Sequence, residues 1–403
     1  MTESASASHA GSILVINGGS STLKFALFRD GAIPVRELSG SIDRIGAPEA
    51  TLTWTKDRAA TVERQPIKAS NHVACIEPLL SALGNKAVQN PLVAIGHRVV
   101  HGGRHYREPH MVTPVVMEEL QRLSAYDPEH LPAEIELIKG FAQRYPHLPQ
   151  VACFDTAFHR DMPRVACLLT IPRRYEKLGL QRYGFHGLSY AFLMRELERV
   201  GAPYEVKGRI ILAHLGNGAS MAAVKAGKAV DTSMGFSPAS GLPMSRRSGD
   251  LDPGLVAYLA RTEGMRAEQF HKMVNTESGL LGISETSSDM RDLLKQEQDD
   301  QRAAEAVALF CYQAKKWIGA LTATLGGLDT LVFTAGIGEH SPVIRARICD
   351  GLEFLGVALD TVRNEAGEAV ISSEGSRVTV RVIHTDEESE IARSVLEMIG
   401  AKS

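Results

Sequence analysis

The sequence predicts an α/β protein with two related domains. Two observations support this fold class. A strand–turn–strand pattern occurs twice, about two hundred residues apart, and apolar runs of strand length alternate with helical patterns in both halves of the chain. The length of 403 residues fits two or three domains.

The two copies of the repeat have the same order of elements. In the first, strands are predicted at residues 13–16, 23–28 and near 34–38, with a Gly/Ser turn after the first strand. In the second, strands are predicted at residues 210–213, 221–225 and 229–231, and a Gly-rich turn spans residues 214–220. The repeat favours an internally duplicated architecture, although hairpins with Gly turns are common enough to produce it by coincidence.

The remaining elements alternate in the same way. Further strands are predicted at residues 93–100, 150–154 and 330–333. Helices are predicted at residues 117–124, 133–144, 188–200, 252–262, 303–325, 342–351 and 387–399. The last of these helices is long enough to pack back on another domain.

The composition excludes several classes of protein. A formal charge of -3 gives no global field to attract nucleic acid or an anionic membrane, so an anion must be bound by local design. Five cysteines without paired spacing indicate reduced thiols and a cytoplasmic protein. No apolar stretch approaches the ~20 residues that span a bilayer, and residues 1–12 are predicted to form a disordered tail.

Three Gly-rich turns are candidate phosphate sites, because such turns present several backbone N–H groups close together. The first runs from Asn17 to Lys24; a strand follows it, so it is not a Walker A loop, and a plain hairpin turn is the alternative. The other two comprise His214, Leu215, Gly216, Asn217 and Gly218, and Gly336, Ile337, Gly338 and Glu339. A nucleotide held between two domains is the simplest explanation of all three.

A guanidinium beside an apolar side chain is predicted on the strand at residues 93–100. Arg98 and Val100 share a face of this strand. Such a pair fits a small carboxylate with a short alkyl tail. A salt bridge from Arg98 to a nearby acid is an equal alternative.

Three further positions are candidates for chemistry. Asp155 follows a predicted strand, where it could orient Mg²⁺ or a nucleophile, or cap the next helix. His186 is a candidate donor to a phosphoryl group, with a core histidine as the alternative. Of the adjacent Arg246 and Arg247, one is a candidate phosphate clamp, unless both are simply solvated.

Taken in order, eight motifs resemble those of the acetate kinase family, in the superfamily of sugar kinases, actin and heat-shock ATPase domains. They cover the chain from Ile13 onward. The motifs are NGGSSTLK from Asn17, GHRVVHGG from Gly96, FDTAFH from Phe154, RYGFHG from Arg182, HLGNG from His214, RSGDLDP from Arg247, SSDMR from Ser287 and TAGIGE from Thr334.

The resemblance implies reversible transfer of the ATP γ-phosphoryl group to acetate or another short-chain carboxylate. It implies two actin-like (ribonuclease H-like) domains with a nucleotide cleft between them. Residues 13–155 and a C-terminal helix at about 388–403 would form the acyl-substrate domain, and residues 156–387 the nucleotide-binding domain. A homodimer is also implied.

The resemblance assigns roles to individual residues. Asp155 would be the catalytic acid, and His186 and Arg247 would stabilise the phosphoryl group in flight. Asn17 and Glu387 would hold Mg²⁺, or Mn²⁺ in its place. The acyl substrate would be bound by Arg98, Val100, Phe185 and Pro238. The ATP or ADP site would be lined by Lys24, His214, Leu215, Gly216, Asn217, Gly218, Asp289, Met290, Arg291, Gly336, Ile337, Gly338, Glu339 and His340.

Several positions depart from the family pattern. Ala125 and Tyr126 stand where leucine and histidine are usual, and the small Ala125 would leave room for a longer acyl tail. Arg246, Glu285 and His340 replace a usual threonine, glycine and asparagine. Propionate or butyrate is therefore an alternative to acetate.

Two alternatives come from other branches of the superfamily. A sugar kinase would need polar groups to recognise hydroxyls, where this sequence has Arg98 beside Val100. An ATP-binding chaperone or filament module would need a peptide-binding domain or a polymerisation insert, for which the motifs leave no room.

Overall fold

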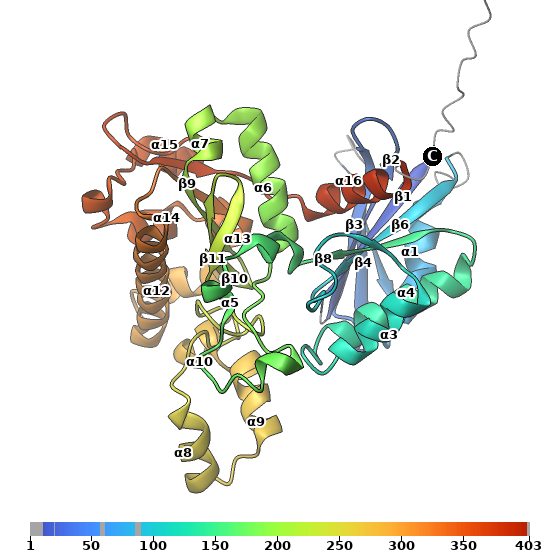
Figure 1. Cartoon of the computed structure of the whole chain (residues 1–403), viewed down its shortest axis with the longest axis horizontal. Coiled ribbons are helices and arrows are strands. Elements are labelled where there is room, and N and C mark those ends of the chain that lie inside the picture. Colours follow the sequence, from blue (N-terminus) through green and yellow to red (C-terminus); the bar gives the residue numbers. More distant parts are fainter. Residues whose placement is uncertain (1–10, 20, 57–60, 85–89, 401–403) are drawn as a thin grey trace, which may run out of the picture. The chain divides into compact units, whose positions relative to one another are not determined.

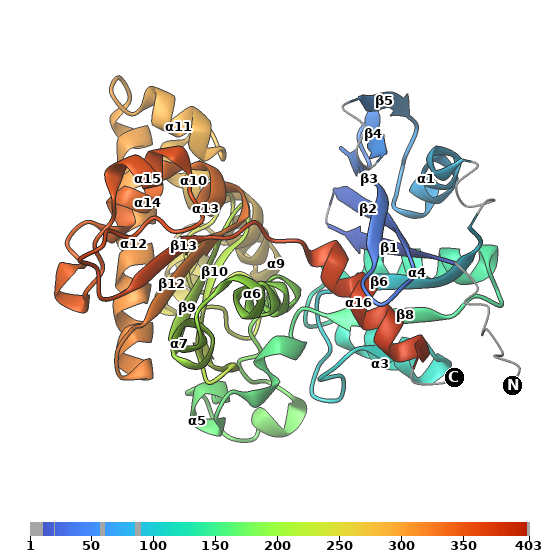
Figure 2. The same ribbon diagram turned by 90° about the horizontal axis from the view of Figure 1, so that it is seen from above.

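The computed structural model describes residues 11–19, 21–56, 61–84 and 90–400. The chain divides into two compact units (Figures 1 and 2). Unit 1 comprises the residues before Phe158 together with those from Asp386 onward, and unit 2 is Phe158–Thr385. Most of the predicted tail at residues 1–12 lies outside the described residues, as does Ser20 of the first Gly/Ser turn, but Ser12 already belongs to a strand.

Unit 1 contains one mixed sheet, with strands in the order β5-β4-β3-β2-β1-β6-β8-β7. The bounds are β1 Ser12–Gly18, β2 Thr22–Arg29, β3 Val35–Asp43, β4 Ala50–Lys56, β5 Val62–Ile67, β6 Leu92–Val99, β7 His110–Met111 and β8 Gln150–Phe154. Strand β1 pairs antiparallel with β2 and parallel with β6, which pairs parallel with β8.

Unit 2 contains a second mixed sheet, in the order β11-β10-β9-β12-β13. The bounds are β9 Arg209–Leu215, β10 Ala219–Lys225, β11 Lys228–Thr232, β12 Thr330–Thr334 and β13 Thr379–Val382. Strand β9 pairs antiparallel with β10 and parallel with β12, which pairs parallel with β13. This is the order and sense of β3-β2-β1-β6-β8, so the predicted fold class of two related α/β domains is confirmed.

The helices of unit 1 cover both faces of its sheet. They are α1 (Ile76–Leu83), α3 (Pro114–Leu123), α4 (Leu131–Arg144) and α16 (Glu387–Gly400). The side chain of Ile95 packs in the same core as Phe141 of α4. Its neighbour Gly96 points to the other face, where a Cβ would lie 2.5 Å from Ile391 and 2.7 Å from Val395 of α16. Glycine at this position therefore allows the C-terminal helix to approach β6 closely (Figure 2).

The sheet of unit 2 is also covered on two faces. Helix α6 (Gly187–Val200) packs Tyr190, Leu193 and Leu197 against Ile210 and Leu212 of β9. The 25-residue helix α12 (Gln301–Leu325) packs against β9, β10 and β11. The remaining helices are α5 Arg164–Cys167, α7 Pro203–Lys207, α8 Gly254–Thr262, α9 Ala267–Lys272, α10 Gly279–Ser284, α11 Met290–Gln296, α13 Ala335–His340, α14 Pro342–Cys349 and α15 Thr361–Ala366.

Two of the predicted turns differ from the structure. The second Gly-rich turn is only Gly216–Gly218, because β9 and β10 extend on either side of it. The third is not a turn: helix α13 follows β12 directly. The physical reason is Glu339, whose carboxylate accepts hydrogen bonds from the Ala335 N–H (2.7 Å) and the Thr334 hydroxyl (3.1 Å) at the start of the helix.

Two further findings on the described part of the chain concern its helices and its cysteines. No helix in it has both the length and the apolar character needed to cross a membrane. Burial raises the pKa of Cys75 and Cys349 to about 12 each, so these thiols stay protonated.

Candidate active site

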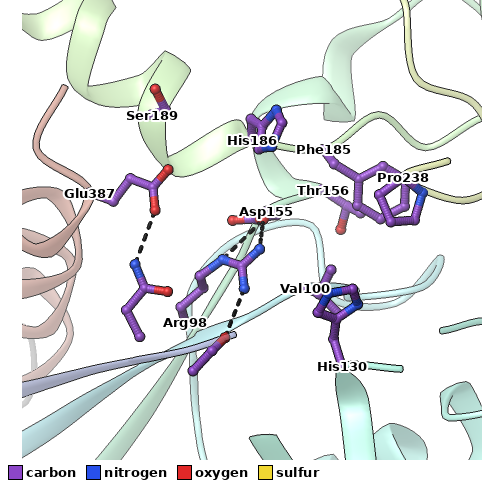
Figure 3. Close-up of polar contacts among 12 residues, drawn as sticks. Arg98, Val100, His130, Asp155, Thr156, Phe185, His186, Ser189, Pro238 and Glu387 are labelled. Carbon is purple, nitrogen blue, oxygen red and sulfur yellow. Dashed lines mark hydrogen bonds and ion pairs between the residues drawn. The ribbon is translucent and has the colours of Figure 1, made fainter. Parts of the chain in front are cut away.

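Arg98 of β6 lies at the centre of a buried ion network in unit 1 (Figure 3). Its Nε and Nη2 donate to Oδ2 of Asp155, at 3.2 and 2.6 Å. Its Nη1 donates to the Gly18 carbonyl (3.1 Å) and to Oε1 of Glu134 (3.3 Å). The salt bridge that the sequence left as an alternative is therefore present, and a bound carboxylate would share this guanidinium with two protein carboxylates.

Glu134 of α4 is a member of this network that the sequence did not reveal. Its side chain is 2% exposed, and its Oε2 accepts a hydrogen bond from the Val100 N–H (2.9 Å). Burial raises the pKa of Glu134 to about 8, although the charge of Arg98 and the Val100 N–H act in the opposite direction. Glu134 is therefore mostly protonated, and neutral, at pH 7.

Asp155 follows β8, and its N–H donates to the Val99 carbonyl at 3.0 Å. Its side chain is 1% exposed. Burial raises the pKa of Asp155 to about 6; Arg98 lowers it, Glu387 raises it further and His130 lowers it. One of its oxygens, Oδ1, is buried and has no hydrogen-bond partner among the described residues. A buried carboxylate oxygen without a partner is suited to an additional ligand.

A second acidic cluster lies where β1 meets the start of α16. The amide of Asn17 donates to Glu387 (3.1 Å) and to Glu388 (3.2 Å). Burial and the neighbouring Glu387 raise the pKa of Glu388, while Lys24 opposes this shift. The structure thus brings together Asn17 and Glu387, the two predicted metal ligands. An amide oxygen of Asn17, the carboxylate of Glu387 and the unpaired oxygen of Asp155 are the ligand types that Mg²⁺ prefers, so the chemistry of these residues fits the ion.

His186 of unit 2 caps the N-terminus of α6 with a left-handed backbone, at a φ of 58°. Its Nδ1 is 2.8 Å from the hydroxyl of Ser220, which also bonds to the hydroxyl of Tyr190. The ring of His186 stacks on that of His214, with 4.1 Å between centroids. His214 is itself 2.9 Å from the hydroxyl of Ser189. A left-handed conformation is costly for a residue other than glycine, and these contacts hold the imidazole in place.

The other predicted phosphate residues of unit 2 lie near His186. A Cβ added to Gly218 would lie 3.0 Å from Nε2 of His186 and 3.9 Å from Nη1 of Arg247. Arg247 donates to the Pro238 carbonyl at 3.3 Å. The loop that carries Arg247 is tied to the Gly216–Gly218 turn by the Ser245 N–H, which donates to the Asn217 carbonyl at 3.1 Å. The structure therefore gathers His186, Gly218 and Arg247 in one place.

The Gly216–Gly218 turn and the start of α13 are also adjacent in unit 2. The Gly216 Cβ position is 3.4 Å from Cβ of Ala335 and 3.8 Å from the Gly336 nitrogen. Asp289 caps α11 and binds Arg291 through Oδ2 at 2.6 Å, so the Arg291 guanidinium is held on the surface by its own helix cap. Lys24, in contrast, belongs to unit 1, where with Arg36 and Glu388 it lines a cavity of about 230 Å³.

The residues predicted to bind the acyl group are divided between the units. Arg98 and Val100 belong to unit 1, whereas Phe185 and Pro238 belong to unit 2. Val100 and Phe185 are buried, with exposed fractions of 2% and 1%. At the position where the family has histidine, the ring of Tyr126 packs edge-on against His101, with 5.5 Å between centroids.

His130 provides a buried imidazole in unit 1 that the motifs did not indicate. Its Nδ1 is 2.8 Å from Oδ1 of Asp127. Its position three residues after Asp127, at the start of a helix, was a weak signal for this pair.

A model of the Acetokinase family matches residues 12–393. The chain belongs to the acetokinase family. Acetate kinase from Staphylococcus aureus is 44% identical to it over 402 residues, which cover 97% of this chain and 99% of that one. Acetate kinase from Methylocella silvestris is 42% identical over 400 residues, with 96% and 98% covered.

Solved structures of the acetokinase family have the same fold. Porphyromonas gingivalis acetate kinase matches with a TM-score of 0.87 and 36% identity, covering 97% of this chain and 100% of that one. A propionate kinase from Francisella tularensis matches with a TM-score of 0.88 and 35% identity, covering 95% and 98%. Since an acetate kinase and a propionate kinase match equally well, membership of the acetokinase family does not decide the length of the acyl chain.

The raised pKa of Glu134 predicts a pH-dependent effect on stability. Between its ordinary pKa of 4.5 and about 8, the folded state holds a proton that the unfolded state has lost. The free energy of unfolding of the wild type should therefore fall relative to that of Glu134→Gln as the pH rises through this range, by at least about 1 kcal/mol, and stay level above it.

Urea unfolding of both proteins at about pH 5 to 9 measures this difference. Glu136→Gln, which changes an exposed carboxylate on the same helix, is the matched control and should run parallel to the wild type. Parallel curves for Glu134→Gln as well would contradict the raised pKa.

Proposed function

We propose that this protein catalyses reversible transfer of the γ-phosphoryl group of ATP to acetate, or to another short-chain carboxylate, in a single in-line step. The observation that carries the proposal is the match to acetate kinases over nearly the whole chain, with 44% identity over 402 residues. An oxygen of the acceptor carboxylate attacks the γ-phosphorus, the bond to the β,γ-bridging oxygen breaks, and ADP leaves with the electron pair.

The acceptor needs no base in this reaction. A short-chain carboxylic acid is ionised at neutral pH, as a Glu side chain with a pKa near 4.3 is. We therefore infer that Asp155 acts by position and charge: it holds the guanidinium of Arg98 and keeps Oδ1 available. Arg98 would orient the acceptor carboxylate, and Val100 would contact its alkyl tail. Protonated Glu134 would reduce the repulsion that an incoming anion meets in this network.

Unit 2 supplies the groups that would bind the phosphates. His186 and Arg247, next to Gly218, would stabilise the charge that spreads over the equatorial oxygens during transfer. The Gly216–Gly218 turn and the adjacent start of α13 at Gly336 would hold ATP or ADP through backbone N–H groups. Asn17 and Glu387 would hold Mg²⁺, which when bound neutralises charge on the phosphates. On these assignments unit 1 is the acyl-substrate unit and unit 2 the nucleotide unit.

The function is tested by an ADP-release assay of the purified chain with MgATP and acetate, propionate or butyrate. Turnover is expected with at least one of these acids, and the ranking measures whether Ala125 admits a longer tail. Glycerol and glucose are the controls for a sugar kinase. Turnover with these alcohols and with none of the acids would overturn the proposal. Asp155→Asn is expected to abolish the ADP release that depends on the added carboxylate.

Arg247 is expected to act on the transition state more than on nucleotide binding. Arg247→Ala should lower kcat by about 10²–10³-fold, the loss typical of one donor to a developing charge, with a much smaller change in the KM for ATP. Steady-state kinetics measure both constants. Arg246→Ala, an exposed neighbour, is the control and should stay close to the wild type. A loss of equal size in nucleotide affinity would make Arg247 a binding residue instead.

We also propose a homodimer formed through the α8 region, which protrudes from the rest of unit 2 in Figure 1. Within the described chain α8 buries none of its residues, and Leu255, Val256 and Tyr258 are 38%, 44% and 56% exposed. Light scattering should give twice the chain mass of 43.7 kDa. Tyr258→Glu should shift the protein towards the monomer, whereas Phe354→Glu, at an exposed position elsewhere in unit 2, should not. A monomeric wild type would refute this.

A further inference from the structure

Three side chains of unit 2 converge at the end of α13. Glu339, His340 and His384 each offer one ligand atom, and these atoms all lie within 4.8 Å of one another. Oε2 of Glu339 is 2.7 Å from Nδ1 of His384 and 3.8 Å from Nε2 of His340. His340 stands where the family usually has asparagine, so an imidazole here is a departure of this chain.

The carboxylate of Glu339 is fixed before any ligand arrives. Its Oε1 accepts hydrogen bonds from the Thr334 hydroxyl (3.1 Å), the Ala335 N–H (2.7 Å) and the Thr385 N–H (3.0 Å). These contacts leave Oε2 directed to the two imidazoles. Although burial opposes it, these donors and His384 lower the pKa of Glu339, so the group stays ionised.

The two imidazoles, in contrast, are open to solvent. The side chain of Glu339 is 10% exposed, whereas those of His340 and His384 are 70% and 72% exposed. Their rings lie 5.8 Å apart between centroids. The cluster therefore consists of a largely buried, oriented carboxylate and two accessible imidazoles.

We propose that Glu339, His340 and His384 form a binding site for a divalent transition-metal ion of the zinc class. Two imidazole nitrogens and one carboxylate oxygen are a donor set that zinc binds with a fourth position left for water or another oxygen ligand. Mg²⁺ prefers oxygen ligands throughout, so this site differs in chemistry from the one formed by Asn17 and Glu387.

The geometry is close to what such an ion requires. Zinc binds nitrogen and oxygen at about 2.0–2.2 Å, so two of its tetrahedral ligands are roughly 3.3 Å apart. The separations of 2.7 and 3.8 Å from Oε2 of Glu339 lie on either side of this value. Small movements of the two exposed imidazoles would reach it, with the carboxylate held in place by its three donors. These donors would act as the outer shell that orients a metal ligand.

The site is also connected to the start of helix α13. The carboxylate that would bind the ion holds the N–H of Ala335, whose φ of 65° is left-handed, directly before Gly336. A metal bound to Glu339 would therefore be connected to the start of α13 through this hydrogen bond. Metal binding itself does not depend on the proposed kinase activity, so the two can fail separately.

The experiment is a calorimetric titration of the metal-free chain with Zn²⁺, together with a titration with Co²⁺ followed by its visible absorption. In excess Mg²⁺, which would fill the site proposed at Asn17 and Glu387, one Zn²⁺ or Co²⁺ ion per chain is expected, and the bound Co²⁺ should give the intense bands of a site with few ligands. His340→Asn and His384→Asn should each weaken binding by at least about 10–100-fold, the range seen when even an outer-shell partner is lost.

The matched control is His147→Asn, which removes an exposed histidine of unit 1 and should leave the affinity unchanged. Glu339→Gln should also weaken binding, and circular dichroism at the same temperature verifies that each variant is folded. If His340→Asn and His384→Asn bind Zn²⁺ as the wild type does, or if the Co²⁺ spectrum survives in both variants, the proposal is wrong.

Discussion

The buried charge of Arg98 is the constraint on which the rest of unit 1 depends. A guanidinium out of water costs several kcal/mol unless nearby groups compensate it. Asp155 at the end of β8 provides the opposite charge, and Glu134 of α4 and the Gly18 carbonyl accept further hydrogen bonds. One side chain of β6 therefore links the ends of β1 and β8 with α4. Removing either carboxylate would disturb this arrangement as well as the chemistry.

The network holds more carboxylates than its single guanidinium can neutralise. Glu387 adds a further negative charge that raises the pKa of Asp155, which burial has already raised. The excess is relieved when Glu134 takes up a proton, as its pKa of about 8 implies. Arg98 and Asp155 then form a neutral pair at pH 7, which an anionic substrate can approach. On the proposed function, the protonation of Glu134 would ease the approach of the acceptor carboxylate to Arg98.

Periodicity and turn chemistry predicted nine of the thirteen described strands because both depend on neighbouring residues, and they did not reveal β4, β5, β7 and β13. Strand β8 was predicted at its observed bounds, and β1 and β9 within two residues at each end. Glu134 was missed because nothing local separates it from Glu136 on the same helix; only the packing of α4 on the sheet buries the first and exposes the second. The start of α13 was missed because Gly336 and Gly338 disfavour a helix, and the carboxylate that stabilises it comes from Glu339.

The duplicated hairpins show how one scaffold can serve two chemistries. Asn17 pairs with Lys24 across β1 and β2, and His214 pairs with Ser220 across β9 and β10, and each pair lies next to the last pair of its ladder. Both pairs meet the first residues of a 14-residue helix that covers the sheet.

The residue that this pair contacts at the start of the helix differs between the two units. In unit 1 the pair lies beside Glu388 of α16. Glu388 accepts a hydrogen bond from Asn17, and the charge of Lys24 acts to lower the pKa of Glu388. In unit 2 the pair meets His186 at the start of α6, through a stacked ring and a hydroxyl. A carboxylate favours a cation, and an imidazole that can donate hydrogen bonds favours a phosphate. The two units have the same strand order but carry different side chains at equivalent positions. These differences are sufficient to give unit 1 the proposed metal site and unit 2 the proposed phosphoryl site.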